Sequence, residues 1–312
     1  MVGKDDILVS VGLPVRNGAG RMAGVVESVL AQDHAKLELV ISDNASSDGT
    51  EDLCRSLAAR DSRVVYHRNP VNVGMLNNFV NTLMLATGTY FRWVGDDDWL
   101  HPHCLSRALD IFTADDRLVL VTNEVEYAGE DGVPRIASYD GAALGSSDPV
   151  ERFAEYLRLL TDDTLQIDPL YGTLRRESVL HIGRRNILRE DEVYATKLAL
   201  AGPWGHVPEV LARRIWKYEN MSVLANRLDV PRWQAPFATL LQCREMLHWL
   251  AECDLTGQQR HRARLAVARM FMRRQQNSVT RRGRKVARIA REVAPSLHRA
   301  ADAHRDPSDS HG

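Results

Sequence analysis

The sequence predicts an α/β protein with a mainly parallel sheet, helices on both faces and a helical C-terminal extension. Over roughly the first hundred residues, short apolar runs alternate with stretches whose apolar residues recur at helical spacing. After Pro231 the pattern is purely helical. The chain has 312 residues, of which 44% are apolar and 26% charged. This length and composition are typical of a globular protein with one large domain and an appendage.

Each element has its own signal. Residues 7–13 form a nearly continuous apolar run typical of a buried strand, and residues 22–30 carry apolar side chains at helical spacing. The Ser-Ser-Asp-Gly-Thr segment at 46–50 supplies capping side chains for a helix to about residue 59. Further strands are expected at 37–41, 64–67, 119–125 and 207–211 and in a segment ending at 94, and further helices at 75–86, 150–160, 191–201 and after Pro231 with a break near 256–257.

Charge is distributed unevenly along the chain. Residues 260–299 contain thirteen Lys or Arg and one acid, whereas the whole chain has a net charge of −1, so the remainder is acidic. We expect an α/β domain at 1–220, a helical, basic region at 221–301 and a disordered tail at 302–312. The basic region is compatible with packing on the acidic body, with attachment to an anionic membrane surface, or with nucleic acid binding. Nucleic acid is not expected, because no recognition motif accompanies the charge.

The compartment follows from two features. No apolar run is long enough to span a bilayer, and the first residues lack the apolar core of a signal peptide. The cysteines form no CxxC pair and no zinc-like spacing, so we expect reduced, structural thiols. We therefore expect a cytoplasmic protein, with peripheral contact at the inner membrane surface as an option. The four cysteines are Cys54, Cys104, Cys243 and Cys253.

Polar clusters follow three of the predicted strands. Pro14-Val15-Arg16-Asn17 follows the first, Asp43-Asn44 the second, and Asp96-Asp97-Asp98 the strand that ends at residue 94. Because the carboxyl ends of parallel strands meet at one edge of a sheet, a single nucleotide could touch all three clusters. Adjacent carboxylates repel one another unless a cation joins them, and Mg²⁺ or Mn²⁺ takes carboxylate and phosphate oxygens together. The alternative for the triplet is a solvated acidic turn.

These segments resemble the family 2 glycosyltransferases, metal-dependent enzymes with the GT-A fold, over roughly residues 7–214. The resemblance is carried by residues 9–17 with their Pro-x-x-Asn turn, by residues 43–50, by residues 72–79 and 86–90, and by Gly95 to Pro102, which looks like the metal-binding motif. A further match is Arg189-Glu190-Asp191-Glu192 followed by the Val-Pro-Glu strand at 207–209.

The resemblance implies a role for each matching residue. Asp191 corresponds to the general base, and Asp97 and Asp98 to ligands of Mn²⁺ or Mg²⁺. Tyr171, Arg175 and Glu190 lie where relatives approach the acceptor. The nucleotide-binding residues that it implies are Pro14, Val15, Asn17, Asp43, Asn77 and Asp96.

The implied reaction moves a sugar from a UDP- or dTDP-sugar to an acceptor hydroxyl by direct displacement with inversion. The acceptor is a saccharide, a lipid-linked saccharide or a small natural product. We expect the helix N-terminus and three nearby arginines to keep Asp191 ionised and therefore a weak base. These arginines are Arg184, Arg185 and Arg189.

The chain departs from the family pattern at two points. Gly95 stands where many relatives carry the first carboxylate, which leaves open which aspartates touch the metal and which the ribose. No histidine is present near residues 213–216, where many relatives have one. For the tryptophans the sequence favours core packing over sugar stacking. They are Trp93, Trp99, Trp204 and Trp216.

Two rival functions have other sequence requirements. A nucleotide-sugar pyrophosphorylase shares the sheet but begins with a glycine-rich basic loop, which residues 14–18 do not form. A non-catalytic protein could keep the nucleotide pocket or use its basic tail for interaction. The intact Asp191 and Asp96-Asp97-Asp98 argue against decay of the site.

Overall fold

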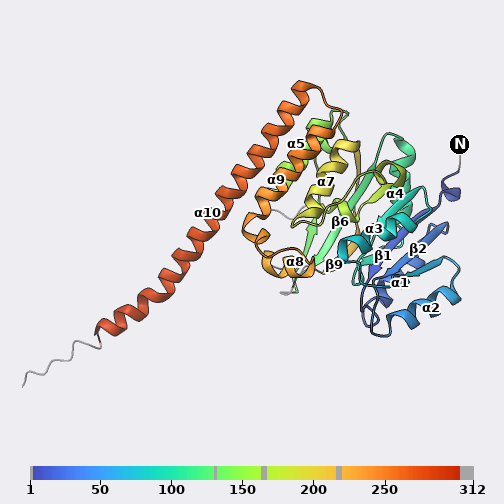
Figure 1. Cartoon of the computed structure of the whole chain (residues 1–312), viewed down its shortest axis with the longest axis horizontal. Coiled ribbons are helices and arrows are strands. Elements are labelled where there is room, and N and C mark those ends of the chain that lie inside the picture. The colour runs from blue at the N-terminus through green and yellow to red at the C-terminus, as the bar shows by residue number, and fades with distance from the viewer. Residues whose placement is uncertain (1–2, 130–131, 163–166, 216–219, 303–312) are drawn as a thin grey trace, which may run out of the picture.

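A computed structural model describes residues 3–129, 132–162, 167–215 and 220–302, with side chains described as far as residue 280. Within these ranges the chain forms a nine-stranded sheet in the order β3-β2-β1-β4-β8-β6-β9-β5, with β7 beside β6. Helices cover both faces (Figure 1). The strands are β1 (Val9–Val15), β2 (Leu37–Asp43), β3 (Val64–Arg68), β4 (Tyr90–Trp93), β5 (Trp99–Leu100), β6 (Leu120–Ala128), β7 (Pro134–Ala137), β8 (Thr173–Arg175) and β9 (Trp204–Ile215).

The sheet has a parallel half and a mixed half. Strands β3, β2, β1 and β4 are all parallel. Strand β8 is antiparallel to both of its neighbours, β4 and β6, whereas β6 and β9 are parallel. The predicted mainly parallel α/β fold is therefore confirmed, with antiparallel pairs confined to the second half. The α-helices are α1 (Ala23–Leu30), α2 (Thr50–Arg60), α3 (Met75–Leu85), α4 (Cys104–Ala114), α5 (Pro149–Leu159), α6 (Arg176–Val179), α7 (Glu190–Ala201), α8 (Met221–Arg227), α9 (Gln234–Glu252) and α10 (Gly257–Asp302).

Two apolar cores lie on the two faces of the sheet. Alternate residues of β1, from Val9 to Val15, pack with α1 and α4. On the other face, Phe91 and Trp93 of β4 pack with α3, α5 and α7. Burial on both faces explains why these strands are nearly continuous apolar runs.

A third apolar cluster joins the C-terminal helices to the body. Phe153 of α5, Val193 of α7, Met246 of α9 and Val267 of α10 are all buried in it. Helix α10 then continues away from the body as a single long element (Figure 1). Among the described residues, no helix combines the length and apolar character needed to cross a membrane.

Several boundaries differ from the predictions. Strand β1 continues through Val15, and β2 ends on Asp43, so these residues belong to strands rather than to the turns that follow. Helix α4 was not predicted, although Leu105, Ala108 and Phe112 recur at helical spacing. The short 3₁₀ helix η3 (Pro169–Tyr171) and the three-residue β8 are too short to show any period. The predicted disordered tail lies outside the described residues, apart from Asp302 at the end of α10.

Candidate functional site

The predicted polar clusters meet at the carboxyl edge of the parallel strands. Val15 at the end of β1 pairs with Asp43 at the end of β2, and Gly12 of β1 pairs with Trp93 at the end of β4. The Asp96-Asp97-Asp98 triplet follows Trp93 closely. Adjacent parallel strands therefore bring the three clusters to one edge, as the sequence predicted.

Asn17 clamps the loop after β1 to the loop after β2. Its backbone is left-handed, with φ of 53°, a conformation that asparagine tolerates better than most residues. Its N–H donates to Ser46 Oγ at 2.9 Å, and its Oδ1 accepts from the N–H of Ser47 at 2.9 Å. The N–H of Gly18 likewise donates to Thr50 Oγ1 at 2.9 Å. The two loops are thus held at a fixed separation before any ligand arrives.

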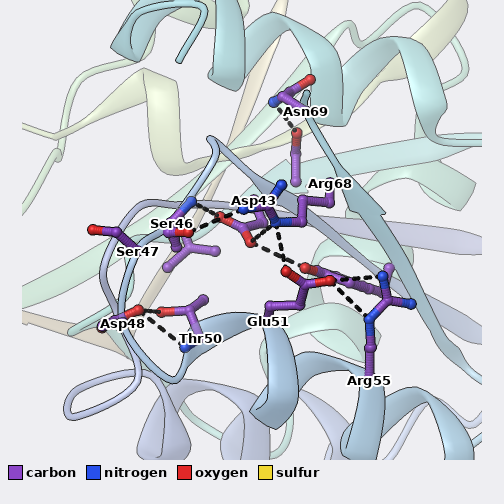
Figure 2. A network of polar contacts seen from close by, with 12 residues as sticks. Asp43, Ser46, Ser47, Asp48, Thr50, Glu51, Arg55, Arg68 and Asn69 are labelled. Atoms are coloured by element: carbon purple, nitrogen blue, oxygen red, sulfur yellow. Dashed lines mark hydrogen bonds and ion pairs between the residues drawn. The ribbon is translucent and has the colours of Figure 1, made fainter. Parts of the chain in front are cut away.

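Asp43 is fully buried and its carboxylate is oriented by several donors (Figure 2). Oδ1 accepts from the N–H of Ser46 at 2.9 Å, and Oδ2 accepts from the hydroxyl of Tyr66 at 3.0 Å. Arg68 Nε lies 3.6 Å from Oδ2 and 2.8 Å from Glu51 Oε2. Burial and the hydrogen bond to Asp43 raise the pKa of Tyr66, so its hydroxyl remains a donor.

Two adjacent asparagines on α3 differ in burial, and the sequence indicated the exposed one as a nucleotide-binding residue. Asn77, the predicted nucleotide-binding residue, is exposed and donates from Nδ2 to the carbonyl of Val73 at 2.8 Å. Asn78 is buried, accepts from Ser42 Oγ at 2.8 Å and donates to the Ser42 carbonyl at 2.9 Å. Its position four residues before the buried Thr82 is the signal that could have placed it on the inner face of the helix.

The protein supplies its own cations to the aspartate triplet. Asp96 forms an ion pair with Arg21, whose pKa is raised by this hydrogen bond and by the charges of Asp96 and Asp97. Asp98 is buried; its Oδ2 accepts from the N–H of Gly95 at 2.7 Å and its Oδ1 accepts from Arg214 Nε at 3.0 Å. The sequence indicated a metal ion as the cation that joins these carboxylates, but arginines of the protein itself already pair with Asp96 and Asp98. Among the described residues, no group of three or more His, Cys, Asp or Glu is placed to hold a metal.

Arg214 on β9 connects the triplet to a second carboxylate. Besides Asp98, it donates from Nη1 to Asp168 Oδ2 at 2.5 Å. Its guanidinium carbon lies 3.4 Å from the centroid of the Tyr171 ring. In the sequence this position stands out only for its missing histidine, because nothing in the local pattern indicates two partners so distant along the chain.

Asp191 lies in the first turn of α7, which follows Arg189 in a left-handed conformation, with φ of 64°. Its side chain reaches solvent, yet burial among surrounding protein atoms and the charges of Glu192 and Asp168 raise its pKa to about 7. The predicted low pKa was therefore wrong. Each of the three arginines expected to lower it pairs with another acid: Arg184 with Glu190 at 2.5 Å, Arg185 with Glu245 at 2.8 Å and Arg189 with Glu192 at 2.7 Å.

The three predicted acceptor residues are not together. Tyr171 lies in the site beneath Arg214. Glu190 is buried in its ion pair with Arg184. Arg175 pairs with Tyr90 at the beginning of β4, the opposite edge of the sheet from the triplet, and donates to backbone carbonyls there. This placement argues against a role for Arg175 at the acceptor.

The tryptophans divide by burial. Trp93 and Trp204 are buried in the core, as favoured by the sequence. Trp99 is half-buried, with Arg213 over its ring at 4.8 Å. Trp216 lies outside the described residues. All four cysteines are free thiols.

This fold and site define a glycosyltransferase of the GT-A class. Residues 10–180, more than half of the chain, match the sequence model of Glycosyl transferase family 2, and the chain belongs to that family. It is 30% identical over 172 residues to an uncharacterized glycosyltransferase of Nostoc sp., covering 55% of this chain and 52% of that protein.

Two further relatives carry more specific names. The putative colanic acid biosynthesis glycosyl transferase WcaA of Escherichia coli is 31% identical over 127 residues, which are 41% of this chain and 44% of that protein. The abequosyltransferase RfbV of Salmonella typhimurium is 35% identical over 97 residues, 30% of this chain and 29% of that protein. The chain therefore matches about half or less of the length of these relatives.

Solved structures agree on the fold. S. aureus TarS 1–349 in complex with UDP-GlcNAc has a TM-score of 0.59 at 14% identity, covering 86% of this chain and 72% of that one. The mannosyltransferase PcManGT from Pyrobaculum calidifontis has a TM-score of 0.50 at 16% identity, covering 86% of each chain. At these identities the likeness shows the fold alone.

Proposed function

We propose that this family 2 glycosyltransferase moves a sugar from a nucleotide diphosphate sugar to an acceptor hydroxyl by direct displacement with inversion. The observation that carries the proposal is the grouping of Asp43, the aspartate triplet and Asp191. The first two share the carboxyl edge of β2 and β4. Arg214 joins Asp98 to Asp168, whose charge acts on Asp191.

A nucleotide diphosphate is the donor that fits this edge. The Asn17 and Asp43 loops are held together where a nucleoside would lie beyond the strand ends. TarS has been solved with UDP and with UDP-GlcNAc, and PcManGT with GDP-Man. We favour a UDP- or dTDP-sugar for this chain and treat GDP as the comparison.

The donor set of the triplet suits Mn²⁺ or Mg²⁺, because carboxylate oxygens are the ligands that such hard cations prefer. Asp97 is the best candidate ligand, since Asp98 already gives its two oxygens to Gly95 and Arg214. Such ions are often held by one or two carboxylates plus substrate phosphate oxygens, so a complete protein cage is not required. When bound, the ion would neutralise charge that develops on the departing diphosphate. PcManGT has been solved with Mn²⁺.

Asp191 is the candidate general base. A carboxylate whose pKa is about 7 accepts a proton more readily than an ordinary aspartate and is still largely ionised in mildly alkaline solution. It would take the proton of the acceptor hydroxyl as that oxygen attacks the anomeric carbon and the bond to the diphosphate breaks. Attack opposite the leaving group converts an α-linked donor into a β-linked product.

The test begins with binding. UDP, dTDP and GDP are titrated into the protein by calorimetry with and without Mn²⁺, and the nucleotide that binds is followed by turnover with its sugars and by NMR assignment of the product anomer. Asp97→Ala should weaken binding, and Asp110→Ala on α4 should not. Failure of all three nucleotides to bind, or a product that retains the donor anomer, would overturn the proposal. Binding without turnover would favour the non-catalytic alternative.

A further inference from the structure

The C-terminal helices contact the first turn of α7 through a polar network centred on Arg274 of α10. Arg274 Nη2 donates to Glu192 Oε2 at 2.5 Å, and its Nη1 donates to Gln242 Oε1 of α9 at 2.7 Å. Gln242 Nε2 in turn donates to Glu192 Oε2 at 2.7 Å, and Arg189 holds the other oxygen at 2.7 Å. We call these four residues the Arg274 network. It lies beyond residues 10–180, the part of the chain that the family model matches.

Helix α10 also contacts the C-terminal end of α5. Arg274 Nη2 donates to the carbonyl of Leu160 at 3.3 Å, and Asn277 Nδ2 donates to the carbonyl of Thr161 at 3.3 Å. One turn of α10 therefore contacts both the end of α5 and the first turn of α7.

The network is largely shielded from solvent. The side chains of Arg274 and Glu192 are only 12% and 19% exposed, so their charges are poorly screened by water. Burial acts to raise the pKa of Glu192, but the charges of Arg274 and Arg189 hold it below its ordinary value, and Glu192 stays ionised. The next residue, Val193, is buried in the apolar cluster shared with α5, α9 and α10.

We propose that Arg274 is a positioning residue: from α10 it holds the first turn of α7, and with it the carboxylate of Asp191, in the geometry that proton transfer requires. This inference rests on the proposed role of Asp191 as general base. It assigns the C-terminal helices a part in the reaction, because they contact the first turn of the helix that carries Asp191.

The Arg274 network also affects the electrostatic potential at Asp191. Within the described part of the chain, the charged and titratable groups around Asp191 include Glu190 and Glu192 of α7, Asp168 and Tyr171 of the preceding segment, Tyr156 of α5, and Arg184. Arg274 partly cancels the charge of Glu192. Without Arg274, the field of Glu192 at Asp191 increases, so the acidic limb of the kcat profile should move to higher pH.

The variants are Arg274→Ala, Arg274→Lys and, as the matched control, Arg273→Ala, which removes an exposed arginine one position away. Arg274 lines an open hollow of about 580 Å³. Truncating its side chain therefore widens this hollow and does not create a closed cavity in the core. A small displacement of a catalytic group can cost up to about 100-fold. We expect Arg274→Ala to lower kcat by roughly 10- to 100-fold with donor KM and nucleotide Kd within about twofold, and Arg274→Lys to restore part of the loss.

Two readouts separate this inference from the proposed function. Hydrogen exchange of the peptide that spans the first turn of α7 needs no turnover; it should accelerate in Arg274→Ala and stay at the wild-type rate in Arg273→Ala. The acidic limb of kcat should shift upward in Arg274→Ala, less in Arg274→Lys, which keeps the positive charge, and not in Arg273→Ala. Unchanged kcat and exchange in Arg274→Ala would overturn the inference, as would an equal loss of nucleotide affinity and thermal stability. If Asp191→Asn keeps full activity, the proposed general base is wrong. Hydrogen exchange in α7 could still depend on Arg274 in that case, so the two failures are distinguishable.

Discussion

At the scale of single residues, three carboxylates differ because their partners differ. Asp43 is fully buried and bound by Ser46 and Tyr66. Asp98 is bound by Arg214. Asp191 has acidic neighbours, and its pKa rises to about 7. The same side chain is therefore a hydrogen-bond acceptor held by fixed donors in two places and, as we propose, the general base in the third.

The raised pKa of Asp191 predicts the pH dependence of turnover. A base acts when ionised, so kcat should rise as pH increases through about 7 and reach a plateau above it. Asp191→Asn should lower kcat by on the order of 100-fold or more, with donor binding nearly intact. Steady-state kinetics between pH 5.5 and 9 check both; near-normal turnover by the variant would show that another group takes the proton.

The same shift predicts the sign of a stability effect. Between the ordinary pKa near 4 and the folded value of about 7, the folded protein binds a proton that the unfolded chain releases, so this group makes stability fall as pH rises. Asp191→Asn removes this titration and with it the decrease in stability at higher pH. Its Tm should exceed that of the wild type at pH 8, and the difference should shrink toward pH 4. A variant that is less stable at pH 8 would indicate that Asp191 makes favourable contacts instead.

Under the proposed function, Arg21 and a divalent cation compete for the same carboxylates. Arg21 pairs with Asp96 and is also close to the charge of Asp97. Its side chain is about half exposed, at 49%, so the pair is a weak one. Arg21→Ala should therefore bind Mn²⁺ about two- to fivefold more tightly in the absence of nucleotide, whereas Asp97→Ala should bind it less tightly. Titration of free Mn²⁺ by electron paramagnetic resonance distinguishes these outcomes, and equal affinity in all three proteins would contradict the assignment of the triplet.

At the scale of elements, the site is built by strand ends and the loops that join them. Asn17 and Gly18 after β1 are held by Ser46 and Thr50 after β2. Buried Asn78 of α3 adds a bond to β2 through Ser42. These contacts cross between elements, so the loops keep their shape without a ligand, and a nucleotide would meet an ordered surface.

Asp43 should matter both for folding and for the nucleotide. Asp43→Ala leaves the Ser46 N–H and the Tyr66 hydroxyl without their acceptor, at a cost of about 1–3 kcal/mol for the buried Ser46 N–H and less for the partly buried hydroxyl. We expect a lower Tm and weaker UDP or dTDP binding. Tyr66→Phe keeps the carboxylate and serves as the control, with a smaller loss of Tm and nearly unchanged nucleotide Kd. Calorimetric Kd values that rise equally in both variants would show that Asp43 acts only through the loop.

At the scale of the whole molecule, the C-terminal helices belong to the support of the site. Helix α10 contributes Val267 and Met270 to the apolar cluster that also holds Val193 of α7. Arg274 follows one turn later and binds Glu192. The helices that succeed the sheet therefore stabilise the element that carries Asp191.

Two truncations should separate the halves of α10. Removing residues 257–312 takes away Val267, Met270 and Arg274, and burial of side chains such as the first two contributes roughly 1.5–3 kcal/mol each. Removing residues 281–312 leaves those contacts in place. We expect a large loss of Tm and of activity only for the longer truncation. Equal Tm for the two proteins would mean that the packed half of α10 contributes little to the fold.

Features that depend on local pattern could be predicted from the sequence alone. The alternation of strands and helices predicted parallel strands, and parallel strands predicted that Asp43 and the Asp96-Asp97-Asp98 triplet share one edge. Free cysteines and the break between α9 and α10 followed from spacing and composition. In each case a few neighbouring residues contain the information, because strand direction and helix ends are local properties.

Partnerships between distant segments were decided only by the tertiary structure. Arg214 binds Asp98, 116 positions away, and Arg274 binds Glu192, 82 positions away. The three arginines near Asp191 in sequence bind other acids, so the pKa that they seemed to set moves in the opposite direction. A charged side chain pairs with an opposite charge that packing brings within a few ångströms of it. The order of the strands and the docking of α9 and α10 decide which charge that is, and the neighbours along the chain do not.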